Sequence, residues 1–331
     1  MKTKKYKVFI PEPEWEESHE ILKEIAEVEV GEPGQRYDEK LLMEKVKDAD
    51  AVMITSQQKI TRRIIENADK LKIIVKYGSK PSIDTVDIDA ATKKGVIVSY
   101  TPGANADSVA EFTIGLILCI LKKICYASYR LRSGLWRDKS LLGYELMGKT
   151  VGIIGLGQIG TRVAKKIQCF DVYILGYDPY VPKESLKKIK VKMTYSLEEL
   201  LKSSDIVTIH AKLTDETYHL IDYKLKLMKR DAFLINTARG AIVDEKGLLK
   251  ALKEGVIAGA ALDVYEIEPP DVKNELLSLD NVLPTPHLAS CTYEAYRREA
   301  YMAAHEVLRV LKGYKPKYIA NPEVLKKVKL R

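Results

Sequence analysis

The sequence predicts an α/β protein with two doubly wound domains, each built on a parallel sheet. At 331 residues, the chain exceeds the size at which single hydrophobic cores usually stop growing. Short β-branched and apolar runs alternate with helix-like stretches along the chain, which is the pattern of parallel sheets connected by helices. With 46% hydrophobic and 30% charged residues, the composition is that of a folded globular protein.

The predicted strands fall into two series separated by a break in the alternation. The first series occupies residues 6–10, 28–30, 51–54, 73–75 and 96–98. Thr101-Pro102-Gly103 interrupts the pattern, and we expect one long helix over residues 107–129 to lead into the second domain. The second series has six strands, at residues 150–154, 172–177, 206–209, 232–235, 258–262 and 282–283. A closing helix over residues 293–312 is expected to pack back onto the first domain, which would make that domain discontinuous.

Charge, cysteine spacing and apolar stretches indicate which partners the chain is not expected to bind: nucleic acid, a cysteine-bound metal or a membrane. The net charge is +8, but the lysines are spread along the chain and usually stand beside glutamate, so no basic stripe predicts a nucleic-acid partner. The four cysteines show no metal-ligand spacing. The longest apolar stretch, residues 112–120, is too short to span a bilayer, and no apolar signal core follows Met1. We therefore expect a cytoplasmic protein without a membrane partner.

Three glycines in the pattern G-x-G-x-x-G follow an apolar strand directly and open a helix. Gly155 permits a tight turn, Gly157 removes a side chain where backbone would approach a pyrophosphate, and Gly160 lets the helix lie close to the strand. Backbone N–H groups at the start of that helix would face the phosphates. The motif therefore predicts a dinucleotide site.

Asp178 ends the next predicted strand, 18 residues after Gly160. An acid near this spacing accepts hydrogen bonds from the adenosine ribose of NAD. A 2′-phosphate would meet a like charge there, so Asp178 favours NAD over NADP. Lys183 keeps NADP as an open alternative.

Arg239, Glu268 and His287 stand at or just after predicted strand ends, where an open α/β sheet binds its ligands. Reduction of a 2-oxo acid by a nicotinamide needs a proton for the developing alkoxide and a group that holds the carboxylate. Histidine, glutamate and arginine can meet both needs. Each also has an ordinary interpretation, as a strand-end histidine, a loop carboxylate or a surface ion-pair partner.

Several motifs, taken in chain order, resemble those of the D-isomer-specific 2-hydroxyacid dehydrogenase family. Members of the phosphoglycerate dehydrogenase and glyoxylate–hydroxypyruvate reductase type are the most similar in pattern. The motifs occupy residues 101–105, 109–112, 236–240, 259–264, 268–269 and 286–287, and the resemblance extends from about residue 73 to the C-terminus. It implies a Rossmann NAD-binding domain, residues 102–292, inserted into a flavodoxin-like substrate domain made of residues 1–101 and 293–331.

The resemblance implies an NAD-dependent oxidoreductase that transfers a hydride between the nicotinamide and C2 of a small D-2-hydroxy acid. His287 would be the general acid in reduction and the base in oxidation, Glu268 would orient its ring, and Arg239 would bind the substrate carboxylate. No metal is needed for this chemistry. Further cofactor contacts implied by the family are Gln158, Ile159, Val109, Thr237, Ala238 and Asp263, with Thr217 as a weaker candidate. His210, at a predicted strand end, is a candidate for the same cleft.

The substrate loop departs from the family pattern. Family members typically carry G-x-G-x-D-N, whereas residues 79–84 read Ser-Lys-Pro-Ser-Ile-Asp, and Pro81 has no N–H to donate. Ser79 and Lys80 are the candidate substrate contacts. Lys80 either replaces the lost amide contacts, extends the pocket toward a phosphorylated or dicarboxylic acid, or points into solvent. Glyoxylate, hydroxypyruvate and 3-phosphoglycerate therefore all stay open as substrates.

Trp136 resembles a tryptophan that reaches the partner subunit's pocket in related enzymes, and residues 126–146 resemble a dimerisation arm. The family resemblance thus implies a homodimer. The alternative function is a catalytically weak NAD(H)-sensing interaction protein of the same fold, similar to a co-repressor.

Overall fold

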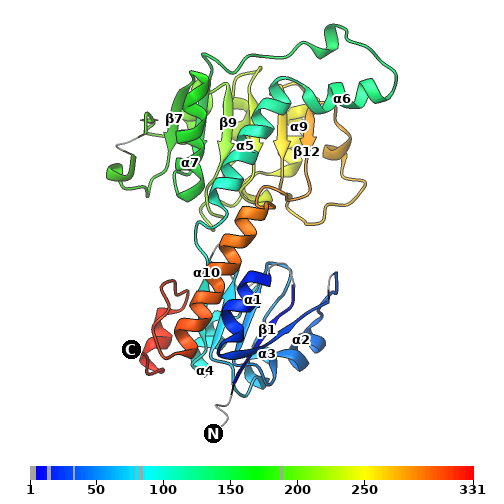
Figure 1. The fold of residues 1–331 in the computed structure, drawn as a ribbon. Coiled ribbons are helices and arrows are strands. Elements are labelled where there is room, and N and C mark those ends of the chain that lie inside the picture. Colours follow the sequence, from blue (N-terminus) through cyan, green and yellow to red (C-terminus); the bar gives the residue numbers. More distant parts are fainter. Residues whose placement is uncertain (1–4, 13–15, 33, 79, 82–84, 187–188) are drawn as a thin grey trace. The chain divides into compact units, whose positions relative to one another are not determined.

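The computed structural model describes residues 5–12, 16–32, 34–78, 80–81, 85–186 and 189–331 (Figure 1). The chain divides into two compact units, one made of residues 1–105 with 292–331 and the other of residues 106–291. Each unit contains one parallel sheet flanked by helices, which confirms the predicted fold class. Among the described residues, no helix is both long and apolar enough to cross a membrane.

The first unit has a five-stranded sheet in the order β2-β1-β3-β4-β5. All neighbouring strands pair in parallel, and the order is that of flavodoxin-like folds. The strands are β1 (Tyr6–Ile10), β2 (Ala26–Val30), β3 (Ala51–Ile54), β4 (Ile73–Lys76) and β5 (Ile97–Tyr100). Every residue of β3 and β4 is buried, because helices cover both faces of the sheet, and these strands therefore read as nearly continuous apolar runs.

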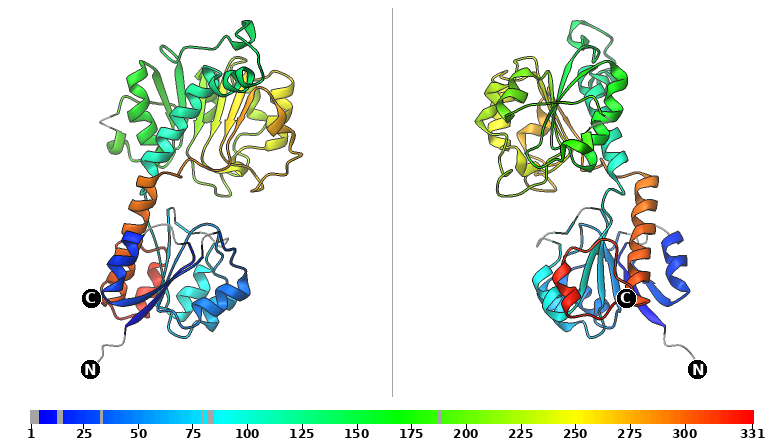
Figure 2. Two further views of the ribbon diagram at one scale, coloured as in Figure 1. Left: turned by 45° about the vertical axis from the view of Figure 1, so that its right-hand side comes forward. Right: turned by 90° about the vertical axis from the view of Figure 1, so that its left-hand side faces the viewer.

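The helices of the first unit cover the two faces of its sheet. One hydrophobic cluster packs under α2 (Glu39–Val46), α3 (Arg62–Asn67) and α4 (Ile88–Lys94). Asp38, Thr61 and Asp87 cap these three helices by accepting hydrogen bonds from backbone N–H groups. The other cluster packs under α1 (Glu16–Lys23) and α10 (Tyr293–Leu311), which lie side by side. The closing helix therefore belongs to the first unit, as Figure 2 also shows.

The second unit has a seven-stranded parallel sheet in the order β12-β11-β10-β9-β6-β7-β8, which extends the Rossmann order by one strand. The strands are β6 (Thr150–Ile154), β7 (Tyr173–Tyr177), β8 (Lys192–Met193), β9 (Ile206–Ile209), β10 (Phe233–Asn236), β11 (Gly259–Leu262) and β12 (Val282–Pro284). The prediction of six strands was wrong by one. β8 is a two-residue edge strand in a lysine-rich stretch, so it lacks the apolar run by which a strand is predicted from sequence.

Helices also cover both faces of the second sheet. α5 (Ala106–Leu121) and α7 (Gln158–Ile167) pack on one hydrophobic cluster, and α8 (Leu197–Ser203) and α9 (Glu245–Lys253) pack on the other. Short 3-10 helices complete the described structure at Lys139–Leu141, Gln168–Phe170, Lys183–Leu186, Tyr223–Leu227, Gly240–Ile242, Glu275–Ser278 and Pro322–Lys326.

The single long helix predicted over residues 107–129 is wrong, because the structure divides it into α5 and α6 (Ile124–Arg132). Lys123 between them has a φ of 53°, in the left-handed region that ends helices. α5 is held by core residues up to Leu121, whereas no residue of α6 is buried. The Leu121 carbonyl accepts a hydrogen bond from the Tyr144 N–H at 2.9 Å, so the chain returns to the end of α5 after α6.

Asp205, just before β9, holds the second sheet together at the amino ends of its strands. Its carboxylate accepts hydrogen bonds from Lys229 Nζ at 2.8 Å and from the Thr150 N–H at 2.7 Å. Burial alone would raise the pKa of Asp205, but the Lys229 ammonium and the Thr150 N–H outweigh it and hold the pKa below its ordinary value.

Replacing Asp205 with asparagine should lower the free energy of unfolding by about 1–2 kcal/mol at neutral pH, since both hydrogen bonds lose their charged acceptor. Because the folded-state pKa is depressed, this contribution is complete above the unfolded value near 3.8 and is lost as the pH falls through the folded value. Urea titrations at neutral pH and at about pH 3 should therefore show a smaller difference from wild type at the lower pH. Asp215→Asn, which changes an exposed carboxylate of the same unit, is the control. An equal difference at both pH values would contradict the prediction.

Candidate active site

The turn between β6 and α7 needs glycine at two of its three positions for its own shape. Gly155 has a φ of 88°, and an added Cβ would lie 2.6 Å from the Ala211 nitrogen. A Cβ on Gly160 would lie 1.9 Å from the Gly155 carbonyl oxygen, so α7 crosses the turn in direct backbone contact. Around Gly157, in contrast, nothing described lies within 4 Å of an added Cβ. The backbone at Gly157 is therefore open to a ligand at the N-terminus of α7.

Asp178 follows β7 directly and lies beside this turn. Its Oδ2 accepts a hydrogen bond from the Leu156 N–H at 2.8 Å, and its Oδ1 accepts from the N–H groups of Tyr180 and Val181 at 2.8 and 3.0 Å. Asp178 therefore also orients the glycine turn, which the motif alone did not predict. A pocket of about 560 Å³ is lined by Leu156, Gly157, Gln158, Thr161, Arg162, Lys165, Asp178, Tyr180, Val181, Pro182 and Ile189.

These residues fit a dinucleotide, because an open helix N-terminus suits phosphates and an adjacent carboxylate suits a ribose. The pocket also contains two cations that were not predicted from the sequence, Arg162 and Lys165. Arg162 donates to Asp107 Oδ2 at 3.0 Å and to the Gln158 carbonyl at 2.7 Å, so part of its charge is already paired. Arg162 stands four residues after Gln158 and Lys165 four residues after Thr161, and this helical spacing could have revealed them. The Lys183 side chain lies outside the described residues.

Val109 and Thr237, both candidate cofactor contacts, are brought together by a buried threonine of α5. Thr113 donates its hydroxyl proton to the Val109 carbonyl at 2.8 Å, and its oxygen lies 2.9 Å from the Thr237 hydroxyl, which therefore donates to it. Thr113 was not predicted, because a threonine within an apolar helix has no distinguishing signal. The neighbouring Ala238 N–H donates to Asn236 Oδ1 at 3.0 Å, which shapes the turn before Arg239.

His210, at the end of β9, lies against the glycine turn. An added Cβ on Gly155 would lie 2.7 Å from the His210 carbonyl carbon. Its Nε2 is 3.0 Å from the Thr208 hydroxyl, and its buried Nδ1 has no hydrogen-bond partner among the described residues. Burial lowers the pKa of His210 to about 3, so the ring is neutral at physiological pH. A buried polar atom without a partner is a feature that a bound ligand can satisfy.

Two other cofactor candidates make mainly local contacts. The Thr217 hydroxyl accepts from the Thr214 N–H at 2.7 Å and donates to the Lys212 carbonyl at 2.6 Å, so it closes its own turn. Ile159 packs partly buried against the cluster between α5 and α7.

His287 and Glu268 form a hydrogen-bonded pair. Glu268 Oε2 accepts from His287 Nδ1 at 2.7 Å, which leaves Nε2 as the ring nitrogen for a reacting group. Glu268 Oε1 accepts from the Tyr265 N–H at 3.1 Å. Burial alone would raise the pKa of Glu268, but the hydrogen bonds from His287 and Tyr265, with the positive charges of His287 and Arg239, hold it below its ordinary value.

Asp263 is fully buried and holds the chain on both sides of His287. Its Oδ1 accepts from the Thr285 hydroxyl at 2.6 Å and from the Leu288 N–H at 2.8 Å, and its Oδ2 accepts from the Ala289 N–H at 2.9 Å. These bonds surround a histidine whose φ is 54°, a conformation that needs such support. The sequence suggested Asp263 as a cofactor contact, and the structure shows in addition that it shapes the His287 loop.

Arg239 is placed beside this pair by close backbone packing. A Cβ on Gly240 would lie 1.9 Å from the Tyr265 carbonyl carbon, so the backbone after Arg239 touches the segment that leads to Glu268. Asn236 Nδ2 donates to the Arg239 carbonyl at 2.9 Å, and Arg239 Nη1 donates to the Ala238 carbonyl at 2.6 Å. The structure therefore brings Arg239, Glu268 and His287 together at the carboxyl ends of β10, β11 and β12.

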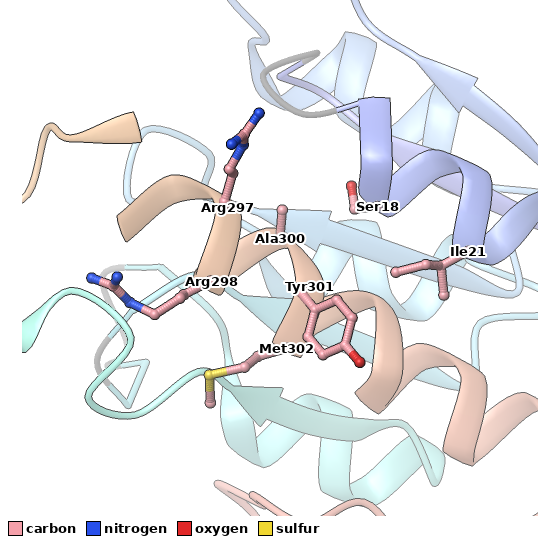
Figure 3. A pocket seen from close by; sticks show the side chains of 7 residues that line it. All are labelled: Ser18, Ile21, Arg297, Arg298, Ala300, Tyr301 and Met302. Carbon is pink, nitrogen blue, oxygen red and sulfur yellow. The ribbon is translucent and has the colours of Figure 1, made fainter. Parts of the chain in front are cut away.

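The predicted substrate-loop residues belong to the first unit. Lys80 is exposed and Pro81 is buried, whereas Ser79 lies outside the described residues. This unit also has a pocket of about 370 Å³ between α1 and α10 (Figure 3). Its lining residues are Ser18, Ile21, Arg297, Arg298, Ala300, Tyr301 and Met302, and none of them was predicted as a site residue.

Comparison with known sequences points to one family. The profile of the D-isomer specific 2-hydroxyacid dehydrogenase NAD binding domain matches residues 114–289 and indicates a nicotinamide dinucleotide cofactor. The D-3-phosphoglycerate dehydrogenase of Methanocaldococcus jannaschii is 44% identical over 316 residues, which are 95% of this chain but only 59% of that longer relative. The glyoxylate reductase of Thermofilum pendens is 45% identical over 328 residues, which cover 96% of this chain and 94% of the relative.

Solved structures agree with the sequence relatives. A crystal structure of a protein from Thermus thermophilus matches with a TM-score of 0.87 and 34% identity, covering 95% of this chain and 99% of that one. The NADPH-dependent glyoxylate/hydroxypyruvate reductase of Sinorhizobium meliloti, solved with NADP and malonate, matches with a TM-score of 0.80 and 25% identity, covering 96% and 98%. The chain therefore belongs to the D-isomer-specific 2-hydroxyacid dehydrogenases, a family of oxidoreductases, as its motifs predicted.

Proposed function

We propose that the chain is an NAD-dependent D-2-hydroxyacid dehydrogenase that transfers a hydride between the nicotinamide and C2 of a small 2-oxo or 2-hydroxy acid. The observation that carries this proposal is the 2.7 Å hydrogen bond between Glu268 and His287 Nδ1, with the backbone that follows Arg239 packed against the segment leading to Glu268. Glyoxylate and 3-phosphoglycerate, named in its relatives, are the substrate types to test first.

Glu268, His287 and Arg239 have three different roles in the proposed reaction: orienting the ring, transferring the proton and binding the substrate carboxylate. When bound, the nicotinamide supplies the hydride in reduction and accepts it in oxidation. Glu268 accepts from Nδ1–H of His287, which orients the ring and leaves Nε2 as the nitrogen that faces the substrate oxygen. His287 then gives the Nε2 proton to the developing alkoxide at C2, and takes it back in oxidation. The planar fork of Arg239 binds the substrate carboxylate, and its charge stabilises the negative charge that develops on the carbonyl oxygen.

The direct test follows NADH absorbance with a panel of 2-oxo acids that includes glyoxylate, hydroxypyruvate and phosphorylated and dicarboxylic members. The proposal expects turnover of at least one of them, with the D-enantiomer of the hydroxy acid as product. NADH binding without any turnover across the panel would contradict it and would favour the alternative, an NAD(H)-sensing interaction protein.

Cofactor choice depends on Asp178 in this proposal. Asp178→Asn keeps one acceptor oxygen for the backbone N–H groups around the glycine turn, and it removes the charge that repels a 2′-phosphate. The ratio of kcat/KM with NADH to that with NADPH should then fall by roughly 10–100-fold, as expected for loss of a charged hydrogen-bond partner and of a like-charge repulsion. Lys165→Ala in the same background should reduce the NADPH activity gained, because Lys165 lines this pocket. An unchanged ratio in Asp178→Asn would remove Asp178 from cofactor selection.

We propose further that two chains form a homodimer through residues 126–146, called here the arm. The arm exposes large apolar side chains that a monomer would leave in water, among them Trp136, which is 74% exposed. The other large apolar side chains of the arm with more than half of their surface exposed are Tyr129, Leu131, Leu135 and Leu142.

Replacing both Leu131 and Trp136 with aspartate should convert the protein from a dimer to a monomer, because two charges would be buried without partners at the contact. Light scattering coupled to gel filtration measures the mass directly. Tyr195→Asp, which changes a 99% exposed aromatic residue outside the arm, is the matched control and should stay dimeric. A wild-type monomer, or an unchanged mass in the arm variant, would refute the proposed contact.

A further inference from the structure

We propose that His219, Asp244 and Glu266 form a binding site for a divalent transition-metal ion such as Zn²⁺, separate from the candidate active site. Each residue offers one ligand atom, and these atoms all lie within 4.8 Å of one another. One imidazole nitrogen with two carboxylate oxygens is a donor set that zinc accepts, and three protein ligands leave a fourth position for water.

The spacing of the best-placed pair already matches a coordination sphere. His219 Nε2 and Glu266 Oε1 are 3.0 Å apart. Two ligands of a tetrahedral zinc ion with bonds of about 2.0–2.1 Å are separated by about 3.3 Å. Asp244 Oδ1 accepts from the Lys246 N–H, which leaves Oδ2 as its available oxygen. Because Gly247 lacks a side chain, nothing from that position crowds Oδ2, whereas a Cβ there would lie 2.8 Å from it.

Strand order brings these three distant residues to one edge of the second sheet. They follow β9, β10 and β11, which are neighbours in a parallel sheet, so their carboxyl ends meet. The His219 N–H donates to the Ala241 carbonyl at 2.8 Å, and the Asp244 N–H donates to the Ile221 carbonyl at 2.9 Å, which ties the first two segments together. Tyr218 stacks on the His219 ring with centroids 4.1 Å apart and thereby holds the plane of the ring.

The charge around the site points independently to a cation. Glu245 adds a third carboxylate, whose segment is joined to Glu266 by hydrogen bonds in both directions. Within the described part of the chain, no lysine or arginine side chain forms an ion pair with Asp244, Glu245 or Glu266. Elsewhere in the same unit, Asp205 and Asp222 each pair with a lysine. Three neighbouring carboxylates, of which Glu266 is paired with His219, form a local negative potential that a divalent ion would neutralise.

The site is distinct from the hydride-transfer residues, although Glu266 and Glu268 stand two positions apart. Glu268 faces His287, whereas Glu266 faces His219. The metal ion therefore has no step in the reaction proposed above. The sequence predicted no metal site because the three ligands are separated by at least 22 residues and lack any short ligand spacing.

Isothermal titration calorimetry, in which Zn²⁺ is added to the full chain after a chelator has removed bound metal, tests the proposal. One equivalent per chain should bind, and Kd should rise about tenfold or more in His219→Asn and in Glu266→Gln. Asparagine tolerates the φ of 47° at position 219, and glutamine keeps an acceptor for the Glu245 N–H, so both variants are expected to fold. Circular dichroism and melting temperature check this expectation.

Two matched variants separate this site from other metal-binding groups. His287→Asn removes the histidine–carboxylate pair of the candidate active site, and His305→Asn removes a half-buried histidine of the first unit. Both should bind Zn²⁺ as the wild type does. Co²⁺ should give visible absorption that persists in these two variants and disappears in His219→Asn. The four cysteines are retained throughout, so binding that survives in His219→Asn would show thiol or other adventitious binding. That result, or the absence of binding to wild type, would overturn the proposal.

Discussion

Replacing His287 with asparagine should lower kcat for 2-oxo acid reduction by roughly 10²–10⁴-fold, the range expected when a general acid is removed. Asparagine tolerates the φ of 54° at this position, and the Asp263 carboxylate continues to hold the flanking backbone, so the loop should keep its shape. NADH affinity, measured by fluorescence titration, should therefore change little. Initial rates at saturating NADH and 2-oxo acid give kcat.

Glu268→Gln is the informative companion to this variant. Glutamine retains an acceptor for the Tyr265 N–H but loses the second carboxylate oxygen, which accepts from His287 Nδ1 and orients the ring, so kcat should fall, but less than in His287→Asn. If His287→Asn turned over at the wild-type rate with normal NADH binding, the acid–base role would be wrong. The family membership would stand in that case, because it rests on the match over residues 114–289 and on the relatives.

Arg239→Lys should raise KM for the 2-oxo acid by roughly 10–100-fold, which corresponds to loss of about 1.5–3 kcal/mol from charged hydrogen bonds. Lysine keeps the positive charge but cannot form the two parallel hydrogen bonds of a guanidinium with a carboxylate. Steady-state kinetics at saturating NADH with varied 2-oxo acid measure the effect.

Arg230→Lys is the matched control, because Arg230 precedes β10 whereas Arg239 follows it, so the two arginines lie at opposite ends of this strand. It should leave KM unchanged. A KM in Arg239→Lys that stays within about twofold of wild type would contradict carboxylate binding by the guanidinium fork.

The sequence predicted most strands because each is a local run of apolar and β-branched residues that must be buried on both sheet faces. It failed where structure depends on distant contacts. The division between α5 and α6 follows from the end of core packing at Leu121 and the left-handed Lys123, and neither is visible in helical periodicity. The edge strand β8 exists because β7 offers unpaired backbone groups beside it, which no property of Lys192 and Met193 reveals.

The candidate site also has features that the sequence predicted and features that only the structure shows. Arg239, Glu268 and His287 were predicted from family motifs, and their catalytic roles stay predictions until the variants above are measured. The structure adds how they are held, through Gly240 against the Tyr265 backbone and Asp263 on both sides of His287.

By itself, the sequence determined the dinucleotide turn and the family, because the needs of Gly155, Gly157 and Gly160 arise within six residues and motifs are read in chain order. Only the tertiary structure decided which distant side chains share a site. Lys165 and Asp178 line the same pocket, and His219 and Glu266 belong to the same proposed metal site. These residues come close because neighbouring parallel strands have their carboxyl ends at one edge of the sheet. That edge is set by strand order, a long-range property of packing that no local residue pattern contains.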